Sequence, residues 1–375
     1  MNAPIYLDYN ATTPVDPRVL GAMLPWLKEG YGNPSSDHVY GRAAHAAVDA
    51  ARTEVAALIG ATPGEIVFTG CATEANNLAI LGTAAARPGG LVCSAVEHPS
   101  VAQPMRHLAE SGRPLAILPV DNSGRAVVDE AAHLIGPATA LVSVMLANNE
   151  VGTIQPIREL ADLAHAAGAI MHVDAAQAAG KIAIDVTALG ADLLTLAGHK
   201  YDAPKGVGTL YVRKGTPLRA IQFGAGHEGG LRPGTENVPH IVALGEAARL
   251  ARETLADEAA RIRSLRDALH DGLSAAIPGL ALNGHAHERL PGTLNLSFPG
   301  VEGWRLLAAA PGLAASTGSA CHTGQHAASG VLGAMGLGPV RAAGAVRLSL
   351  GRFTTVQEIE QAAATLIAAW RQAAA

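Results

Sequence analysis

The chain has 375 residues, of which 49% are hydrophobic and 16% charged, which predicts a soluble globular protein with a large core, most easily divided into two domains. A formal net charge of −5 with dispersed Lys and Arg residues argues against nucleic-acid binding, so we expect a small-molecule ligand and no DNA. The sequence starts without a signal-peptide pattern and has no apolar run of membrane-spanning length, so we expect a cytoplasmic protein with no membrane contact.

The first long region, from about residue 45 to 213, alternates short apolar runs with alanine-rich stretches. This alternation predicts a parallel sheet with helices on both faces. Two of the covering helices are expected at 43–60 and 157–168, ending at Gly60 and Gly168. The predicted strands are EIVFT (65–69), GLVCSAV (90–96), PLAILPV (114–120), ALVSVML (140–146), AIMHVD (169–174), DLLTLA (192–197) and GTLYVRK (208–214).

The pattern changes after about residue 240. Residues 240–276 have helical periodicity over a length too great for an ordinary covering helix, so we expect a bend or a link between domains. Beyond Pro278, short strands such as LPGTLNLSF and AVRLSLG indicate a smaller α+β domain. We therefore predict a large α/β domain over 15–250 and a small α+β domain made of 1–14 and 251–375.

Three cysteines, Cys71, Cys93 and Cys321, occur without a CxxC spacing, so neither a disulfide framework nor a metal site is predicted. Cys321 lies in the run GLAASTGSACHTGQHAAS, a setting of small residues that suits a structural thiol poorly. The sequons at Asn10 and Asn295 are expected to be chance matches.

Polar residues stand at the ends of two consecutive predicted strands. Asp174 ends one strand and is followed by Gln177, and the next strand leads into Gly198-His199-Lys200. Ligands of open α/β sheets bind at the carboxyl ends of the strands, so Asp174 and Lys200 should face the same crevice. These two residues alone are also compatible with a plain ion pair.

Other predicted strand ends add further polar groups. Ala72 and Thr73 fall at the start of a helix, where free backbone N–H groups favour an anion such as phosphate, although Thr73 is also compatible with a plain N-cap. His98 follows another strand, and Asn149 follows a fourth. A lone histidine at such a place is more often structural, but here four strand ends share one crevice.

This set of groups suits pyridoxal phosphate. The cofactor needs a lysine for its Schiff base, an acid at its pyridine nitrogen, an aromatic ring on its face, a donor to its phenolic oxygen and an anion site for its phosphate. The sequence supplies one of each, in that order: Lys200, Asp174, His98, Gln177 and the Ala72–Thr73 turn. In contrast, GAGHEG (224–229) matches a dinucleotide fingerprint only by its letters, because no helix pattern follows it.

From about residue 5 to 370, the chain resembles the cysteine desulfurases, which are fold type I pyridoxal-phosphate enzymes of aminotransferase class V. The resemblance depends on eight motifs in the family's order: LDYNATTP, GNPSS, ANNEVGTIQPI, HVDAAQAAGKI, GHKYDAPKGVGTLYVR, LRPGTENVP, GSAC and VRLSLGR. It implies that Lys200 is the Schiff-base lysine, and that Asp174, Gln177 and His98 contact the cofactor ring.

The resemblance also implies roles for the remaining positions. Ala72, Thr73 and His199 correspond to phosphate ligands. Thr235 corresponds to a threonine that reaches the phosphate of the neighbouring subunit, which implies a homodimer. Two residues, Asn149 and Arg347, correspond to substrate ligands, and the arginine grips the α-carboxylate in a bidentate manner. Cys321 corresponds to the catalytic cysteine.

The activity implied is conversion of L-cysteine to L-alanine, with the sulfur left on Cys321 as a persulfide for an acceptor or scaffold protein in iron–sulfur cluster, thio-cofactor or tRNA synthesis. GSACHTG resembles the selenocysteine lyases at least as closely, so L-selenocysteine is the alternative substrate. Transamination, another reaction of this class, would give Cys321 no role in the chemistry. The alternative from a different functional class is an inactive scaffold that binds an acceptor protein.

Two positions depart from the desulfurase pattern. Ala197 stands where many desulfurases have a serine, so one hydroxyl donor to the phosphate is missing. Cys71 stands where glycine or another small residue is usual, and we expect it to be packed rather than reactive.

Overall fold

A mixed sheet forms the centre of the computed structural model, which describes residues 3–318 and 329–374. Within these residues its seven strands lie in the order β2-β8-β7-β6-β5-β3-β4. They are β2 (Ile66–Thr69), β3 (Gly90–Ser94), β4 (Leu115–Leu118), β5 (Thr139–Met145), β6 (Ile170–Asp174), β7 (Leu193–Ala197) and β8 (Gly208–Val212). Strand β8 runs antiparallel to both of its neighbours, β2 and β7, and all other pairs in this sheet are parallel. The predicted α/β fold with a mostly parallel sheet is therefore confirmed.

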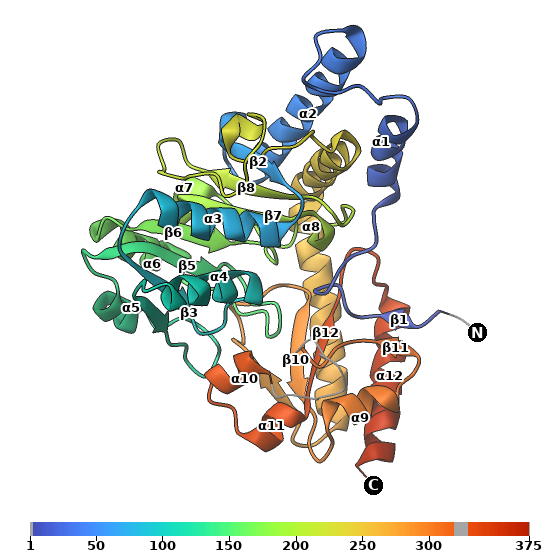
Figure 1. Cartoon of the computed structure of the whole chain (residues 1–375). Helices are drawn as coiled ribbons and strands as arrows, with labels where there is room; N and C mark the ends of the chain where they lie inside the picture. Colours follow the sequence, from blue (N-terminus) through green and yellow to red (C-terminus); the bar gives the residue numbers. More distant parts are fainter. Residues whose placement is uncertain (1–2, 319–328, 375) are drawn as a thin grey trace.

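Helices cover both faces of this sheet (Figure 1). One buried apolar cluster joins the sheet to α2, α6 and the first half of α8, and a second joins its other face to α3 and α4. The helices before α8 are α1 (Pro17–Lys28), α2 (Val39–Leu58), α3 (Ala72–Ala86), α4 (Pro99–Glu110), α5 (Val128–Leu134), α6 (Ile157–Ala166) and α7 (Val186–Leu189). The predicted stops hold, because Gly60 and Gly168 follow α2 and α6 with φ of 68° and 74°. Helix α2 begins earlier than predicted, where the His38 side chain caps it.

Helix α8 (Val238–Ala276) runs without interruption for 39 residues. It contains two glycines, and one of them, Gly245, allows close packing, since a Cβ there would lie 2.5 Å from Ala51 Cα. The first half of α8 belongs to the core beside the large sheet, and residues such as Leu269 and Leu273 belong to another core. The long helix thus contributes to both cores, as its length indicated. None of the helices in the described ranges is both long and apolar enough to cross a membrane.

The second core surrounds a small antiparallel sheet in the order β12-β10-β9. Its strands are β9 (Ala281–Asn283), β10 (Thr293–Ser297) and β12 (Ala345–Ser349). The helices of this part of the chain are α9 (Gly303–Ala308), α10 (Gly330–Ala334), α11 (Pro339–Ala343) and α12 (Val356–Ala373). Helix α10 packs in a separate small cluster with residues such as Met145 and Val151. Strand β1 (Ile5–Tyr6) pairs in parallel with β11 (Leu313–Ala314). This pairing ties the start of the chain to its C-terminal part (Figure 1). The exact division at residues 14 and 250 stays a prediction.

Candidate active site

Asp174 is the last residue of β6, in register with Met145 of β5 and Thr195 of β7. Its side chain is 5% exposed. One carboxylate oxygen, Oδ2, accepts a 2.8 Å hydrogen bond from Asn76 Nδ2, and the other accepts one from the Ala176 backbone N–H at 3.0 Å. The carboxylate is therefore fixed by donors at the carboxyl edge of the sheet.

Lys200 ends the short 3₁₀ helix η2 (Gly198–Lys200), which directly follows β7. Its Nζ donates to the carbonyl oxygens of Asn10 at 2.7 Å and Ala11 at 2.8 Å. Burial, with the positive charge of Arg347, lowers the pKa of Lys200 to about 8. Near neutral pH a far larger share of the amine is therefore neutral and nucleophilic than in an ordinary lysine. Lys200 and Asp174 hold separate partners and do not form the plain ion pair.

Asn10 connects several polar groups beside Lys200. Its carbonyl oxygen accepts from Gln177 Nε2 at 2.9 Å, and its Oδ1 accepts from Lys181 Nζ at 3.0 Å. Lys181 also donates to Gln177 Oε1 at 2.7 Å. Burial, with the charges of Lys200 and Arg347, lowers the pKa of Lys181 to about 7. The sequence analysis missed Asn10 and Lys181 as individual residues, although both lie within motifs that carry the family resemblance.

His98 precedes α4 and caps it by accepting from the Ser100 backbone N–H at 3.1 Å. The ring is exposed to a hollow of about 540 Å3, which Thr73 also lines. Burial of the ring lowers the pKa of His98; the charge of Asp174 opposes this shift and that of Lys200 adds to it. Residues predicted at two separate strand ends therefore line one hollow.

Helix α3 begins at Ala72, as predicted, and its N-cap is Cys71. The plain N-cap role considered for Thr73 is therefore wrong. The expected packing of Cys71 is also wrong, because its side chain is exposed. The backbone of the turn, not the thiol, is packed: a Cβ on Gly208 would lie 2.7 Å from the Cys71 carbonyl carbon. The first backbone N–H groups of this 15-residue helix remain suited to an anion.

His199 lies within η2, and its Nδ1 forms a 3.1 Å hydrogen bond with Thr12 Oγ1. Burial and the charges of Lys200, Lys205 and Lys181 lower the pKa of His199 to about 4. The imidazole is thus neutral at physiological pH. Ala197 is buried at the end of β7.

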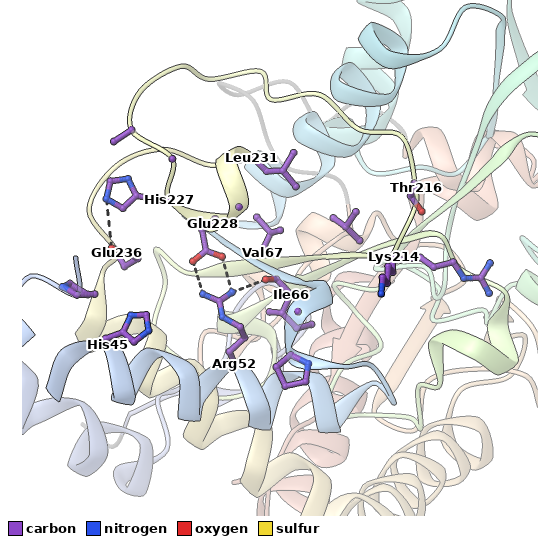
Figure 2. Close-up of a pocket in the computed structure, with 18 of the residues that line it drawn as sticks. His45, Arg52, Ile66, Val67, Lys214, Thr216, His227, Glu228, Leu231 and Glu236 are labelled. Carbon is purple, nitrogen blue, oxygen red and sulfur yellow. Dashed lines mark hydrogen bonds and ion pairs between the residues drawn. The ribbon is translucent and has the colours of Figure 1, made fainter. Parts of the chain in front are cut away.

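Thr235 is exposed in the loop 213–237 between β8 and α8. Figure 2 shows how this loop is held: both carboxylate oxygens of Glu228 accept from Arg52, at 2.8 and 2.7 Å. Glu228 also accepts from the Phe68 backbone N–H at 2.7 Å. The adjoining hollow of about 810 Å3 is lined, among the described residues, by none of the predicted site residues. Within one chain, the structure does not bring Thr235 close to the other predicted site residues.

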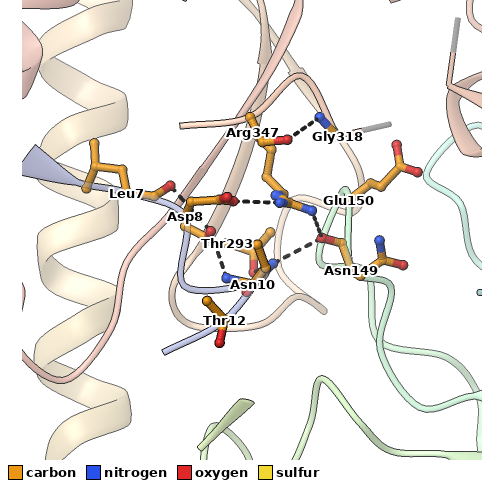
Figure 3. A network of polar contacts seen from close by, with 12 residues as sticks. Leu7, Asp8, Asn10, Thr12, Asn149, Glu150, Thr293, Gly318 and Arg347 are labelled. Carbon is orange, nitrogen blue, oxygen red and sulfur yellow. Dashed lines mark hydrogen bonds and ion pairs between the residues drawn. The ribbon is translucent and has the colours of Figure 1, made fainter. Parts of the chain in front are cut away.

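Arg347 lies on β12 with 5% of its surface exposed. Its Nη2 donates to Asp8 Oδ1 at 2.6 Å and its Nη1 to the Asn149 carbonyl oxygen at 3.1 Å (Figure 3). Its buried Nε has no hydrogen-bond partner within the described residues. Asn10 Nδ2 donates to the same Asn149 carbonyl oxygen at 3.2 Å. The predicted substrate residues are thus connected through Asn10 to Lys200, and Asp8 is a member that the sequence analysis missed.

Cys321 lies outside the described residues. Gly318 and Ser329 stand on either side of that gap, and both contact Glu150. Ser329 Oγ donates to Glu150 Oε2 at 2.5 Å, and a Cβ on Gly318 would lie 2.9 Å from the same oxygen. Both ends of the chain around the gap therefore lie beside one carboxylate near Arg347, and Ser329 is hydrogen-bonded to it.

Known proteins resemble this chain over nearly its whole length. The Aminotransferase class-V family matches residues 5–362. The cysteine desulfurase IscS of Anaeromyxobacter dehalogenans (strain 2CP-C) is 46% identical over 368 residues, with 96% of this chain and 91% of that protein covered. A solved NifS-like protein is 36% identical with a TM-score of 0.91, covering 97% and 98% of the two chains. A structure titled SspA in complex with cysteine is 34% identical with a TM-score of 0.82, covering 93% and 99%.

Proposed function

Because this chain belongs to the aminotransferase class-V family, and within it to the cysteine desulfurases, we propose that it uses pyridoxal phosphate to convert L-cysteine into L-alanine. The sulfur atom passes to Cys321 as a persulfide. One observation carries this proposal: polar side chains suited to the cofactor and substrate follow the adjacent strands β7, β6, β5 and β3. These side chains are Lys200, Asp174, Asn149 and His98.

The donor set fits pyridoxal phosphate group by group. The Lys200 amine, with its pKa lowered to about 8, suits the aldehyde, and the fixed Asp174 carboxylate suits the pyridine nitrogen. His98 offers a ring, Gln177 an amide donor, and the start of α3 an anion site. When bound, the cofactor supplies an electron-withdrawing ring that makes the α-proton of an amino acid removable.

Binding of the substrate falls to Arg347 and Asn149. The guanidinium receives the α-carboxylate by charge-assisted hydrogen bonds, and its unpaired Nε supports such a role. Lys200 Nζ takes the α-proton and later returns it, because its lowered pKa makes the neutral amine available. Asn10 holds this amine in place by its carbonyl oxygen.

Sulfur transfer requires a thiolate, and Cys321 is the proposed nucleophile. The thiolate attacks the sulfur of the substrate; the bond between this sulfur and Cβ breaks, and its electron pair stays with Cβ, which takes up a proton. Alanine leaves and Cys321 keeps the persulfide, so atoms and electrons balance. A sulfur-acceptor or scaffold protein for iron–sulfur cluster or thio-cofactor synthesis is the proposed destination.

A homodimer is the proposed assembly, and an exposed apolar face supports it. Helix α1 presents Leu20, Leu24 and Leu27 with 51%, 40% and 56% of their surfaces exposed. Phe223, in the loop that carries Thr235, is 92% exposed. A second copy would cover these side chains and allow Thr235 to reach its phosphate. Light scattering after size exclusion tests this directly: a monomer at micromolar concentration contradicts it. A cytoplasmic location stays a prediction.

Turnover of the yellow protein with L-cysteine and with L-selenocysteine tests the function, beside the Cys321→Ala variant. The proposal predicts alanine from L-cysteine at a rate comparable to or above that from L-selenocysteine, and loss of cysteine turnover in the variant. Turnover of L-selenocysteine alone would make the protein a selenocysteine lyase. A protein that shows no absorbance at about 400 nm even with added cofactor would instead support the inactive scaffold.

A further inference from the structure

A continuous chain of hydrogen bonds joins two groups of the site through residues that have no assigned role. Asn76 on α3 is fully buried, at 0% exposure. Its Nδ2 donates to Asp174 Oδ2 at 2.8 Å and to Ser100 Oγ at 2.8 Å. Ser100 Oγ in turn lies 2.8 Å from His98 Nδ1, and the Ser100 backbone N–H donates to the same nitrogen at 3.1 Å.

The direction of each hydrogen bond follows from the chemistry of the groups. Asn76 must present its NH2 group to Asp174, because the reverse orientation would place two acceptor oxygens 2.8 Å apart. Its second amide hydrogen is then directed to Ser100 Oγ. The Ser100 hydroxyl therefore accepts from Asn76 and has its own hydrogen left for His98 Nδ1.

His98 Nδ1 consequently receives two donors, the hydroxyl and the backbone N–H of Ser100. A nitrogen that accepts cannot carry the proton of the neutral ring, so that proton lies on Nε2. We propose that Asn76 and Ser100 are positioning residues that fix the His98 imidazole in the Nε2–H tautomer and link this ring to the Asp174 carboxylate.

The charges that face His98 agree with this assignment. Asp174 favours the protonated ring and Lys200 disfavours it, while partial burial favours the neutral form. In the proposed desulfurase, on which this consequence rests, the neutral His98 ring donates a hydrogen bond from Nε2 toward a sulfur atom in the hollow that it lines. Because Nδ1 already accepts two hydrogen bonds and Nε2 carries the ring proton, the neutral ring orients the sulfur atom and does not take a proton from it.

The tautomer is measured directly by long-range 1H–15N correlation spectra of the cofactor-loaded protein with 15N-labelled histidine rings. The loss of signals in His98→Gln assigns the ring. We expect a protonated Nε2 and an unprotonated Nδ1 in the wild type. In Ser100→Ala we expect a mixture of both tautomers and a His98 pKa raised by roughly 0.5 to 1 unit, because one donor that favours the neutral ring is gone.

Ser111→Ala is the matched control, since it removes a hydroxyl from the end of the same helix, where Ser111 Oγ donates to His107 O at 3.0 Å. Its His98 spectrum should equal that of the wild type. Ser100→Thr keeps the hydroxyl and should restore both the tautomer and the pKa. For turnover of L-cysteine, kcat should be about 3- to 10-fold lower in Ser100→Ala than in the wild type, with KM within about twofold. Ser100→Thr and Ser111→Ala should have the kcat of the wild type.

A wild-type spectrum with the proton on Nδ1 overturns the proposal, as does a Ser100→Ala spectrum identical to the wild type. If Ser100→Ala does not fold, the wild-type spectrum alone decides. The readout is separate from turnover. If the protein fixes the Nε2–H tautomer but does not act on L-cysteine, this proposal stands and the proposed function is contradicted. If it acts on L-cysteine but does not fix the tautomer, the proposed function stands and this proposal is contradicted.

Discussion

The two ends of the candidate site are built in different ways. At the cofactor end, Asp174, Lys200 and His98 follow strands of a single sheet, and the strand order alone brings them to one edge. At the substrate end, Arg347 of the small sheet contacts Asp8 of the N-terminal segment and Asn149 in the loop after β5. The cofactor end therefore depends on the topology of one sheet, whereas the substrate end depends on the packing of separate parts.

The charges at the two ends differ as well. The cofactor end contains two lysines, Lys200 and Lys181, whose pKa values burial lowers to about 8 and about 7. The substrate end contains a guanidinium that Asp8 already compensates at 2.6 Å. An incoming carboxylate must share Arg347 with Asp8, so binding and chemistry should respond to different substitutions.

Lys200→Ala should give the largest effect. It removes the amine that holds the cofactor and moves the α-proton, so kcat for L-cysteine should fall by about 10⁴-fold. The absorbance of bound cofactor should be lost from the purified protein. The control is Lys214→Ala, at an exposed lysine, in which kcat and the absorbance of bound cofactor should stay the same. Activity within tenfold of the wild type in Lys200→Ala would remove Lys200 from the chemistry.

Arg347→Lys should separate the two ends. A lysine cannot reproduce the two-pronged contact with a carboxylate, so KM for L-cysteine should rise about 10- to 100-fold. Cofactor affinity, measured by titration of the absorbance, should stay the same. The control is Arg341→Lys on the neighbouring helix α11, in which KM for L-cysteine should stay the same. A large loss of cofactor affinity in Arg347→Lys would show that the two ends are not independent.

Lys181→Met should change how stability depends on pH. Burial lowers the pKa of Lys181 from 10.5 to about 7, so between these values the unfolded chain binds a proton that the folded chain lacks. The free energy of unfolding therefore rises with pH in this window. Removing Lys181 should reduce this slope by up to about 1.4 kcal/mol per pH unit. Urea denaturation at several pH values from about 7.5 to 9.5 measures it. An unchanged slope contradicts the lowered pKa of Lys181.

Ser329→Ala should give the smallest effect, at the substrate end. It removes the 2.5 Å hydrogen bond to the buried Glu150 carboxylate, so the free energy of unfolding should fall by about 1 to 2 kcal/mol. The matched control is Ser123→Ala, which removes a 2.7 Å bond to Asp121 at an exposed position and should cost about 0.5 kcal/mol or less. Equal effects would mean that Glu150 is not a buried anchor.

Sequence reasoning predicted the cofactor end better than the substrate end, for a physical reason. The strands of a parallel sheet present their carboxyl ends at one edge, so Asp174 and Lys200 could be placed together without knowing any packing. Asn149 could be placed at that edge in the same way, but its role as a substrate ligand came from the resemblance. Arg347 was assigned only by resemblance, because no strand rule brings β12 beside the end of β5.

Asn10 shows what local pattern cannot reveal. Its partners are spread along the chain, at Gln177, Lys181 and Lys200 and at Thr293 and Ser349. A short motif shows no such contacts, so Asn10 was interpreted only as a chance sequon. The prediction for Cys71 was wrong for a related reason: a short motif does not show that Gly208 packs against the backbone of the turn while the thiol is exposed.

The most direct test of the account is to reduce the cofactor-loaded protein with borohydride and locate the attached cofactor by peptide mass spectrometry. Two lysines with lowered pKa values, Lys200 and Lys181, share Asn10, so the result is not trivial. The account predicts the cofactor on Lys200 alone. Attachment to Lys181, or to neither lysine, would contradict the proposed architecture of the site.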